Sequence, residues 1–285
     1  MILYAPAKVN LYLRVLGRHS DGYHDIETVF EKIALFDRII LNPLRNGSVK
    51  IFCDSPNVPT GKQSLIRKTV DILRKEKGIS KGAEIKVFKK IPIAAGLGGG
   101  SSDAASILKG LKRLWGVSLS QRRLAELGKK LGADVPFFLR NYSFASGRGR
   151  GDVIKKLGWK KKFWHLIVNP PVKLLSKDVY MSLGKTEKIR AGTVFPRIFR
   201  RKNGIYPYFS NDLEKAVFQK APLVHRLKKA LIEIGAEYSL VSGSGPSVFS
   251  LFEKRKEAIR AKKLLVKHFP AAKRRGWRFF TVSTL

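Results

Sequence analysis

The residues with the clearest chemical potential form a glycine-rich stretch at 92–105, which reads Pro-Ile-Ala-Ala-Gly-Leu-Gly-Gly-Gly-Ser-Ser-Asp-Ala-Ala. Gly96, Gly98, Gly99 and Gly100 have no Cβ, so a phosphate group could approach the backbone closely. The stretch leads into a helix-like segment, whose first turn would add free N–H groups and the positive end of the helix dipole. This pattern predicts a loop that wraps a polyphosphate. A flexible linker is the alternative, but a linker would not need to lead directly into an amphipathic helix.

Two hydroxyl groups follow the glycines. Ser101 and Ser102 would lie at the start of the helix, where a hydroxyl can cap the helix, donate to a phosphate or approach Mg²⁺. Ser102 is therefore our candidate for a protein ligand of Mg²⁺, and we expect the phosphates of a nucleotide to hold the ion as well.

Other nucleotide and metal motifs are missing from the sequence. A Walker A motif requires Gly-x4-Gly-Lys-Ser/Thr, and the nearest approach, Gly184-Lys185-Thr186, has Val179 where the leading glycine belongs. The dinucleotide-binding pattern also fails, because Ser101 occupies the position of its third glycine. The histidines and the single cysteine show no zinc-ligand spacing, and no Gly-x-Ser-x-Gly nucleophile elbow is present. Both of those nucleotide folds are set aside, and zinc is unsupported.

The segments that must position the loop alternate between strand-like and helix-like patterns. Apolar alternation predicts strands at 9–15 and 85–88, and helical spacing predicts helices at 64–76, 104–115 and 121–131. After a second glycine-rich stretch at 147–151, we expect a buried strand at 163–169, a helix at 211–234, a hairpin at 239–252 and a helix at 255–268. This order favours an α+β fold over a doubly wound parallel sheet, with one domain at 1–155 and a second at 156–285.

Composition excludes several classes of protein. The chain has 285 residues, of which 44% are hydrophobic, enough to build one large or two modest domains. Cys53 is the only cysteine and cannot form an internal disulfide, and Lys8 and Arg14 interrupt any signal-peptide core. No stretch reaches the roughly 18 uncharged apolar residues needed to cross a bilayer, so we expect no membrane partner. We therefore expect a soluble protein of the reducing cytoplasm.

The positive charge is less specific. The 57 Lys and Arg residues against 21 Asp and Glu residues give a formal net charge of +36. Lys and Arg gain affinity for nucleic acids by releasing counterions, but here the excess is spread over both halves and forms no basic tail. The same charge would steer a phosphorylated small molecule. A nucleic-acid-binding protein is thus an open alternative, although nucleic acid is not the partner that we expect.

Three blocks of the sequence, in order and spanning almost the whole chain, resemble the GHMP small-molecule kinases. They are Pro6-Ala7-Lys8-Val9-Asn10-Leu11, the loop from Pro92 to Ala105, and Ser242-Gly243-Ser244-Gly245-Pro246-Ser247. Further stretches resemble one family within them, the 4-diphosphocytidyl-2-C-methyl-D-erythritol kinases: Arg18-His19-Ser20-Asp21-Gly22-Tyr23-His24, Leu131-Gly132-Ala133-Asp134-Val135-Pro136-Phe137-Phe138 and Asn211-Asp212-Leu213-Glu214. Homoserine and mevalonate kinases resemble the loop but share the Asp-Gly-Tyr-His stretch less.

The resemblance implies a two-domain α+β fold, the first domain like domain 2 of ribosomal protein S5 and the second ferredoxin-like, with ATP and substrate between them. It implies Mg²⁺-dependent transfer of the γ-phosphoryl group of ATP to the 2-hydroxyl of 4-diphosphocytidyl-2-C-methyl-D-erythritol, a small molecule of non-mevalonate isoprenoid synthesis. The implied ATP-binding residues are Pro92, Ala95, Gly96, Leu97, Gly98, Gly99, Gly100, Ser101 and Ser102. Both a monomer and a homodimer are compatible with it.

The same resemblance makes Asp134 the acceptor of the hydroxyl proton and places Lys8 beside it, with Asn10 positioning the hydroxyl or the diphosphate. A cation within about 4–6 Å keeps an aspartate ionised and favours a developing alkoxide, so the pair suits phosphoryl transfer. From the residues alone, other readings stay open. Asp134 precedes Val135-Pro136 and could be a turn residue, Lys8 could be an ordinary strand-edge charge, and Asn10 could bond to local backbone.

The resemblance implies that three residues recognise the cytosine base. Tyr23 would stack on the cytosine ring, His24 would bond to its edge, and Tyr180 would cover the second face. Asp21-Gly22 is a turn signal that would hold Tyr23 and His24 on a loop. An exposed tyrosine on a helix is the alternative for Tyr180.

The sequence departs from the family at two places. Ser64-Leu65 stands where the family often has Asn-Leu at the adenine pocket, and a hydroxyl cannot reproduce the paired donor and acceptor of an amide. Gly149-Arg150-Gly151-Asp152 stands where the family has Gly-x-Gly-Glu, and the role of Asp152 is open. A GHMP kinase of the homoserine or mevalonate type is the same-fold alternative, which phosphorylation assays on homoserine, mevalonate or galactose would distinguish.

Overall fold

The computed structural model describes residues 1–183, 199–201, 204–206 and 209–285, so Gly184-Lys185-Thr186 lies outside the described residues. The chain forms two compact units. The first unit comprises Met1–Ala7, Leu35–Ile93 and Gly98–Asn141, and the second comprises Lys8–Ala34, Ala94–Leu97 and Tyr142–Leu285. Two long strands, β1 (Ile2–Arg18) and β2 (His24–Leu44), contribute one end to each unit.

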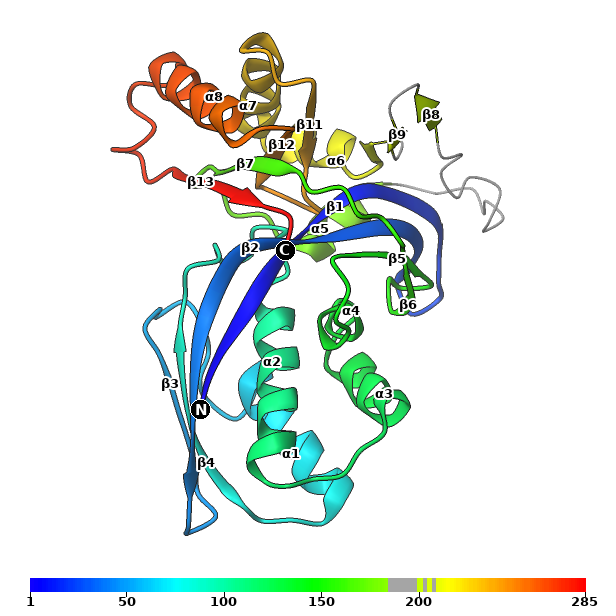
Figure 1. The fold of residues 1–285 in the computed structure, drawn as a ribbon, viewed down its shortest axis with the longest axis vertical. Helices are drawn as coiled ribbons and strands as arrows, with labels where there is room; N and C mark the ends of the chain where they lie inside the picture. The colour runs from blue at the N-terminus through cyan, green and yellow to red at the C-terminus, as the bar shows by residue number, and fades with distance from the viewer. Residues whose placement is uncertain (184–198, 202–203, 207–208) are drawn as a thin grey trace. The chain divides into compact units, whose positions relative to one another are not determined.

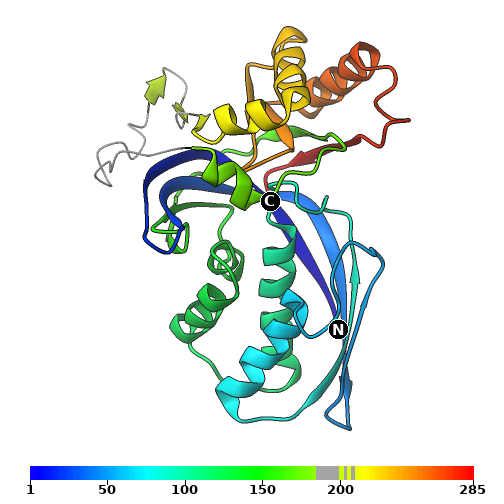
Figure 2. The same cartoon turned by 180° about the vertical axis from the view of Figure 1, so that it is seen from behind.

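The first unit is a sheet with helices on one face, as the views from both sides show (Figure 1, Figure 2). Beside the ends of β1 and β2 its strands are β3 (Val49–Cys53) and β4 (Gly82–Phe88). Strand β4 pairs antiparallel with β2, where Val87 lies opposite Ile39, and parallel with β3, where Ile85 lies opposite Ile51. Its helices are α1 (Leu65–Lys77), α2 (Gly99–Leu114), α3 (Gln121–Leu131) and α4 (Val135–Leu139).

Local sequence determines where these helices begin and end. The hydroxyl of Ser64 accepts the backbone N–H of Arg67 at 3.1 Å and caps α1, and the left-handed Gly78 (φ 61°) ends it. Helix α2 begins differently, because its N-cap is Gly98, which has φ 69° and no side chain to cap the helix. Its first-turn N–H groups are therefore not capped by a side chain of that residue.

The second unit contains the other ends of β1 and β2 and a separate four-stranded sheet. Strands β5 (Phe144–Arg148), β6 (Val153–Lys156) and β10 (Ser210–Asn211) extend the β1–β2 pair, with β10 parallel to β1. The separate sheet has the antiparallel order β11-β12-β7-β13, from β7 (Trp164–Asn169), β11 (Tyr238–Val241), β12 (Val248–Phe252) and β13 (Arg278–Ser283). Strands β8 (Phe199–Arg201) and β9 (Gly204–Tyr206) form a small hairpin.

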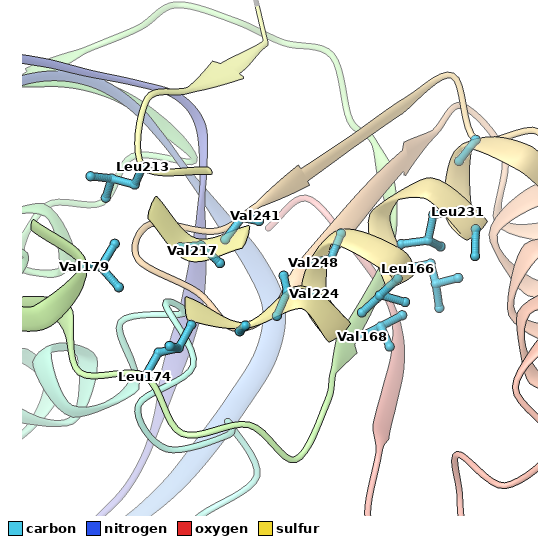
Figure 3. Packing of buried hydrophobic residues seen from close by; sticks show 14 of the residues in the cluster. Leu166, Val168, Leu174, Val179, Leu213, Val217, Val224, Leu231, Val241 and Val248 are labelled. Carbon is cyan, nitrogen blue, oxygen red and sulfur yellow. The ribbon is translucent and has the colours of Figure 1, made fainter. Parts of the chain in front are cut away.

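In the second unit, α7 (Pro222–Glu233) and α8 (Arg255–His268) pack on the four-stranded sheet (Figure 1). Helix α5 (Ser176–Met181) packs against α6 (Glu214–Lys220). Val224 and Leu231, seven residues apart on α7, pack with Leu166 and Val168, two residues apart on β7 (Figure 3). The helical and strand periodicities thus bring apolar side chains into one core.

The observed elements confirm the predicted α+β class and refine the predicted segments. The helices at 121–131 and 255–268 and the hairpin within 239–252 are confirmed. The helix predicted at 211–234 is two helices, because Pro222 cannot continue α6 and instead begins α7. Among the described residues, every helix is too short or too polar to cross a membrane.

Candidate active site

A buried polar chain runs inward from Lys8 in the second unit. The ammonium of Lys8 donates to Asn10 Oδ1 at 2.6 Å, and Asn10 Nδ2 donates to Thr28 Oγ1 at 2.8 Å. Thr28 Oγ1 in turn donates to the carbonyl of Tyr12 at 2.6 Å. Lys8 is 4% and Asn10 2% exposed, so a cation is held in a place where few long charged side chains are found. Sequence analysis singled out Lys8 and Asn10, and the structure brings them together.

Two glycine-rich turns meet next to this chain. The hydroxyl of Ser242 donates to the carbonyl of Gly96 at 2.8 Å, and the backbone N–H of Ser247 donates to the carbonyl of Ala95 at 3.4 Å. The backbone N–H of Lys8 donates to the carbonyl of Leu97 at 3.0 Å. Segment 94–97 and the turn between β11 and β12 are therefore joined to each other and to Lys8 within one unit.

The first unit carries the helical part of the predicted phosphate loop. Gly98 begins α2 in a left-handed conformation, and a Cβ added at Gly100 would meet no atom within 4 Å. Ser102 Oγ is buried and has no hydrogen-bond partner among the residues that the structure describes. An uncapped helix start beside an unfilled position suits an anionic ligand.

A buried ion cluster joins the two ends of this loop. Lys89, at the end of β4, bonds through its ammonium to Asp37 and, at 2.6 Å, to Asp103 Oδ2 in the first turns of α2. Asp37 Oδ1 also accepts the backbone N–H groups of Lys90 at 2.6 Å and Ile91 at 2.8 Å. Burial would lower the pKa of Lys89, but Asp103 and Asp37 raise it above its ordinary value. Burial raises the pKa of Asp103 to about 7, while Lys89 opposes the shift.

Asp134 lies at the N-terminus of α4 in the first unit, half-buried, and its side chain does not cap that helix. The preceding turn lies beside the start of α2, because a Cβ added at Gly132 would be 3.8 Å from Ser101 Oγ. Asp134 follows Gly132 by two residues, in the turn that lies next to the helix start assigned to phosphate. Lys8 belongs to the second unit.

His24 and Tyr180, both predicted to contact the base, pack against each other in the second unit. Their ring centroids are 5.1 Å apart, with 32° between the ring planes. Burial lowers the pKa of His24, and the positive charges of Arg18 and His19 lower it further. A neutral imidazole offers one donor and one acceptor, which is what reading the edge of a base requires.

Tyr23 is 56% exposed and carries a cation on its ring. The guanidinium of Arg150 lies 4.3 Å from the ring centroid and also pairs with the carboxylate of Asp21. Asp21 Oδ1 accepts the backbone N–H of Tyr23 at 3.1 Å, a bond that lowers the pKa of Asp21, to which Arg150 adds. Arg150 and Asp21 therefore fix one side of the Tyr23 ring.

Comparisons with known proteins identify the family of this chain. Residues 64–142 match the family model described as GHMP kinases N terminal domain, and residues 200–271 match the one described as GHMP kinases C terminal. A 4-diphosphocytidyl-2-C-methyl-D-erythritol kinase of Syntrophotalea carbinolica is 37% identical over 278 residues, which cover 98% of this chain and 96% of that protein. The chain belongs to the 4-diphosphocytidyl-2-C-methyl-D-erythritol kinase family. It is an ATP-dependent small-molecule kinase.

Further comparisons agree with this family. The protein of the same name from Geobacter metallireducens is 39% identical over 258 residues, which cover 90% of this chain and 91% of that protein. The crystal structure of 4-(cytidine 5'-diphospho)-2C-methyl-D-erythritol kinase matches with a TM-score of 0.78 and 30% identity, covering 99% of this chain and 98% of that one. A homoserine kinase from Cytophaga hutchinsonii, at 18% identity and a TM-score of 0.71 over 100% of this chain and 94% of its own, shares the fold.

The two departures from the family sequence have a structural setting in this kinase. The hydroxyl of Ser64 is engaged in capping α1, as an asparagine at an N-cap would also be. Asp152 lies in the turn between β5 and β6, where Gly149 and Gly151 have φ values of 65° and 93°. That turn presents Arg150 to Tyr23.

Sequence analysis missed three groups of site residues. Arg150 belongs to the Gly149–Asp152 motif, but sequence analysis assigned it no role, because its contact with Tyr23 depends on the fold of the β5–β6 turn. Lys89 and Asp37 belong to none of the sequence motifs, and nothing in the sequence relates two positions that are 52 residues apart. Asn211 was quoted only as a family signature.

Proposed function

We propose that the chain transfers the γ-phosphoryl group of ATP to the 2-hydroxyl of 4-diphosphocytidyl-2-C-methyl-D-erythritol, a step of non-mevalonate isoprenoid precursor synthesis. The family membership supports the substrate, and the observation that carries the chemistry is the buried Lys8 ammonium, held by Asn10 at 2.6 Å beside two glycine-rich turns. A fixed cation in a site that excludes water stabilises developing negative charge more strongly than one in solvent.

In this proposal Asp134 accepts the proton of the substrate hydroxyl. It lies in the turn that neighbours Ser101, where a reacting phosphate bound at the start of α2 would be within reach. Lys8 keeps the developing alkoxide stabilised, and Asn10 positions either the hydroxyl or the diphosphate. Positioning and charge stabilisation account for most of the catalysis of phosphoryl transfer, because the protein forms no covalent bond to the phosphoryl group.

The nucleotide phosphates are assigned to residues 92–102. Segments without side chains, such as Gly98 to Gly100, expose backbone N–H groups, and the α2 dipole favours an anion there. The residues that we assign to ATP binding are Pro92, Ala95, Gly96, Leu97, Gly98, Gly99, Gly100, Ser101 and Ser102.

Mg²⁺ would join the nucleotide at this helix start. Among the described residues no group of three or more His, Cys, Asp and Glu side chains is placed to hold a metal ion. The buried Ser102 Oγ, which has no hydrogen-bond partner in the described part of the chain, is an oxygen of the hard type that Mg²⁺ prefers. We therefore propose Ser102 as a protein ligand, with the phosphates supplying further oxygens. The bound ion would neutralise charge on the phosphates.

The cytidyl group is assigned to the pocket of Tyr23, His24 and Tyr180. The neutral His24 would read the edge of the base, and Tyr180 keeps His24 in place by packing on its ring at 5.1 Å. Tyr23, fixed from one side by Arg150, would stack on the base with its other face.

Three broader statements belong to the same proposal. The chain divides functionally at about residue 155 into an ATP-binding and a C-terminal GHMP domain, and it works as a monomer or homodimer. It works in the cytoplasm, where the free thiol of Cys53 would stay reduced.

A coupled assay for ADP release tests the proposal. We expect turnover with the cytidyl substrate and less than about one hundredth of that kcat/KM with homoserine, mevalonate or galactose, because a site with unpaired polar groups rejects a substrate that cannot satisfy them. Comparable turnover of mevalonate or homoserine would instead favour another GHMP activity. RNA binding with a steep salt dependence, without turnover of any alcohol, would favour a nucleic-acid-binding protein.

A further inference from the structure

Asn211 is a buried amide, 6% exposed, on the short strand β10 of the second unit. Its Nδ2 donates to the carbonyl of Val241 at 2.8 Å and to the carbonyl of Gly243 at 2.7 Å. Its Oδ1 accepts the backbone N–H of Leu213 at 3.0 Å. The orientation of the amide is thus fixed from both ends, and both of its donor bonds go to the end of β11 and the turn that follows.

Gly243, which receives one of these bonds, lies against the Lys8–Asn10 pair. A Cβ added to Gly243 would be 3.3 Å from Lys8 Nζ and 3.3 Å from Asn10 Oδ1. Gly243 also has φ 55°, a conformation that favours glycine. The backbone of this turn therefore packs against one side of the Lys8 ammonium. If the turn moved, that side of the ammonium would lose its packing.

The neighbouring acids hold other parts of the same structure. Asp212 Oδ2 accepts the backbone N–H of Val15 on β1 at 2.9 Å. Glu214 Oε1 accepts the backbone N–H of Val241 at 2.9 Å, and its Oε2 pairs with Lys228 at 2.6 Å. These bonds secure the strands on either side, whereas Asn211 is the side chain of this stretch that bonds to the turn at Gly243.

We propose that Asn211 is a positioning residue for Lys8, because its two donated hydrogen bonds hold the turn at Gly243 against the Lys8–Asn10 pair. The inference rests on the proposed function, in which Lys8 acts on the reacting hydroxyl. Asn211 itself touches no reacting group and acts through the backbone of Gly243.

The sharpest variant is Asn211→Asp, which keeps the size of the side chain but removes both donors. Its carboxylate would face two carbonyl oxygens and repel them, so the turn would move away from Lys8. Since a displacement of about 1 Å in a catalytic site can cost about 100-fold in rate, we expect kcat for the cytidyl substrate to fall about 10- to 100-fold. The KM of that substrate should change less than about threefold, because Tyr23, His24 and Tyr180 hold most of its binding energy.

A matched control separates positioning from loss of stability. Ser250→Ala removes the buried Ser239–Ser250 hydroxyl pair, 2.6 Å long, from the same β11–β12 hairpin without touching the turn. We expect Ser250→Ala to lower Tm, by less than Asn211→Ala because it removes one buried hydrogen bond and Asn211→Ala removes three, while kcat stays within about twofold. Kinetics are measured well below the Tm of every variant.

The outcomes distinguish this inference from the proposed function. A folded Asn211→Asp or Asn211→Ala with wild-type kcat, or a rise in KM with unchanged kcat, would overturn the role of Asn211 while wild-type activity upholds the proposed function. If both of these variants fail to fold, Asn211→Ser decides, because its single hydroxyl can donate at most one of the two bonds to the turn: reduced kcat at unchanged KM supports the inference and wild-type kcat overturns it. A wild-type protein inactive on the cytidyl substrate would remove the proposed function and this inference with it.

Discussion

The carbonyl oxygen of Ser242 lies 1.9 Å from the point that a Cβ on Gly96 would occupy, while the hydroxyl of the same Ser242 donates to the carbonyl of Gly96 at 2.8 Å. The two glycine-rich blocks are thus in backbone contact, and a side chain at Gly96 would separate them. Gly96 also has φ 74°, which an L side chain rarely adopts. We expect Gly96→Ala to lower the free energy of unfolding by more than about 1 kcal/mol and to weaken ATP binding.

Two other glycines serve as controls for that substitution. A Cβ at Gly158 would meet nothing within 4 Å, and we expect Gly158→Ala to leave both Tm and ATP affinity unchanged. A Cβ at Gly100 also meets no protein atom, but it lies on the proposed phosphate loop, so Gly100→Ala should weaken ATP while Tm stays constant. Scanning calorimetry and titration calorimetry measure the two effects. Wild-type ATP affinity in both Gly96→Ala and Gly100→Ala would mean that this loop does not bind the phosphates.

Asp134→Asn removes the proposed proton acceptor at nearly constant size. A positioned base contributes about 10²- to 10⁴-fold, and a largely dissociative transition state would lower that figure, so we expect kcat to fall about 10²- to 10³-fold. ATP affinity and Tm should not change. Asp71→Asn is the control, because Asp71 forms only an exposed helical ion pair with Arg67, and its kcat should match the wild type. A kcat within about threefold of wild type in Asp134→Asn would exclude Asp134 as the base.

Tyr23→Ala tests the cytosine pocket. Stacking on an aromatic ring is worth roughly 1–3 kcal/mol per base in single-strand binders, which corresponds to a loss of about 10- to 100-fold in kcat/KM for the cytidyl substrate. ATP affinity should hardly change, and Tyr4→Ala, which removes an exposed ring from the first unit, should have no kinetic effect. Steady-state kinetics would contradict the pocket if Tyr23→Ala retained the wild-type kcat/KM.

Asp103 gives the stability of the protein a pH dependence with a defined sign. Burial raises its pKa from 3.8 to about 7, so between these values the folded state binds a proton that the unfolded state has released. Stability from this group is complete below pH 3.8 and is lost as pH rises toward 7, with a slope of at most about 1.4 kcal/mol per pH unit. Asp103→Asn has no carboxyl group at this position, so it does not lose this stability as the pH rises. The free energy of unfolding of both proteins is measured by chemical denaturation at pH 5 and pH 8. Relative to the wild type, Asp103→Asn should be more stable at pH 8 than at pH 5. An equal difference in stability at the two pH values would contradict the raised pKa of Asp103.

Local patterns in the sequence predicted the elements that local physics determines. The helix at 121–131 lies between a capping serine and Gly132, and both signals act within one turn of the chain. The phosphate loop was predicted because its glycines and the following helix are contiguous. By contrast, no local signal predicted that β2 would be 21 residues long. Its length depends on pairing with β4 at one end and with β5 at the other, and both partners are distant in sequence.

In the candidate site, too, residues close in sequence could be predicted together and contacts between distant segments could not. Lys8 and Asn10 were predicted together because they are two residues apart on one strand and their family block is short. Nothing local revealed that Gly243 lies against them, because 233 or more residues separate it from the pair and only the folded hairpin brings the turn there. Arg150 escaped prediction for the same reason, as its contact with Tyr23 depends on the β5–β6 turn.

The most direct measurement of the central claim follows the phosphoryl group itself. The wild-type protein is incubated with ATP, Mg²⁺ and 4-diphosphocytidyl-2-C-methyl-D-erythritol, and the product is analysed by ³¹P NMR, with Asp134→Asn as the low-activity control. We predict one new phosphomonoester resonance, coupled to no proton on the esterified carbon because the 2-hydroxyl is tertiary, and no product from the uridyl analogue at equal enzyme concentration. Equal phosphorylation of the cytidyl and uridyl compounds, a phosphate on a primary or secondary hydroxyl, or no phosphorylated polyol at all would contradict the account.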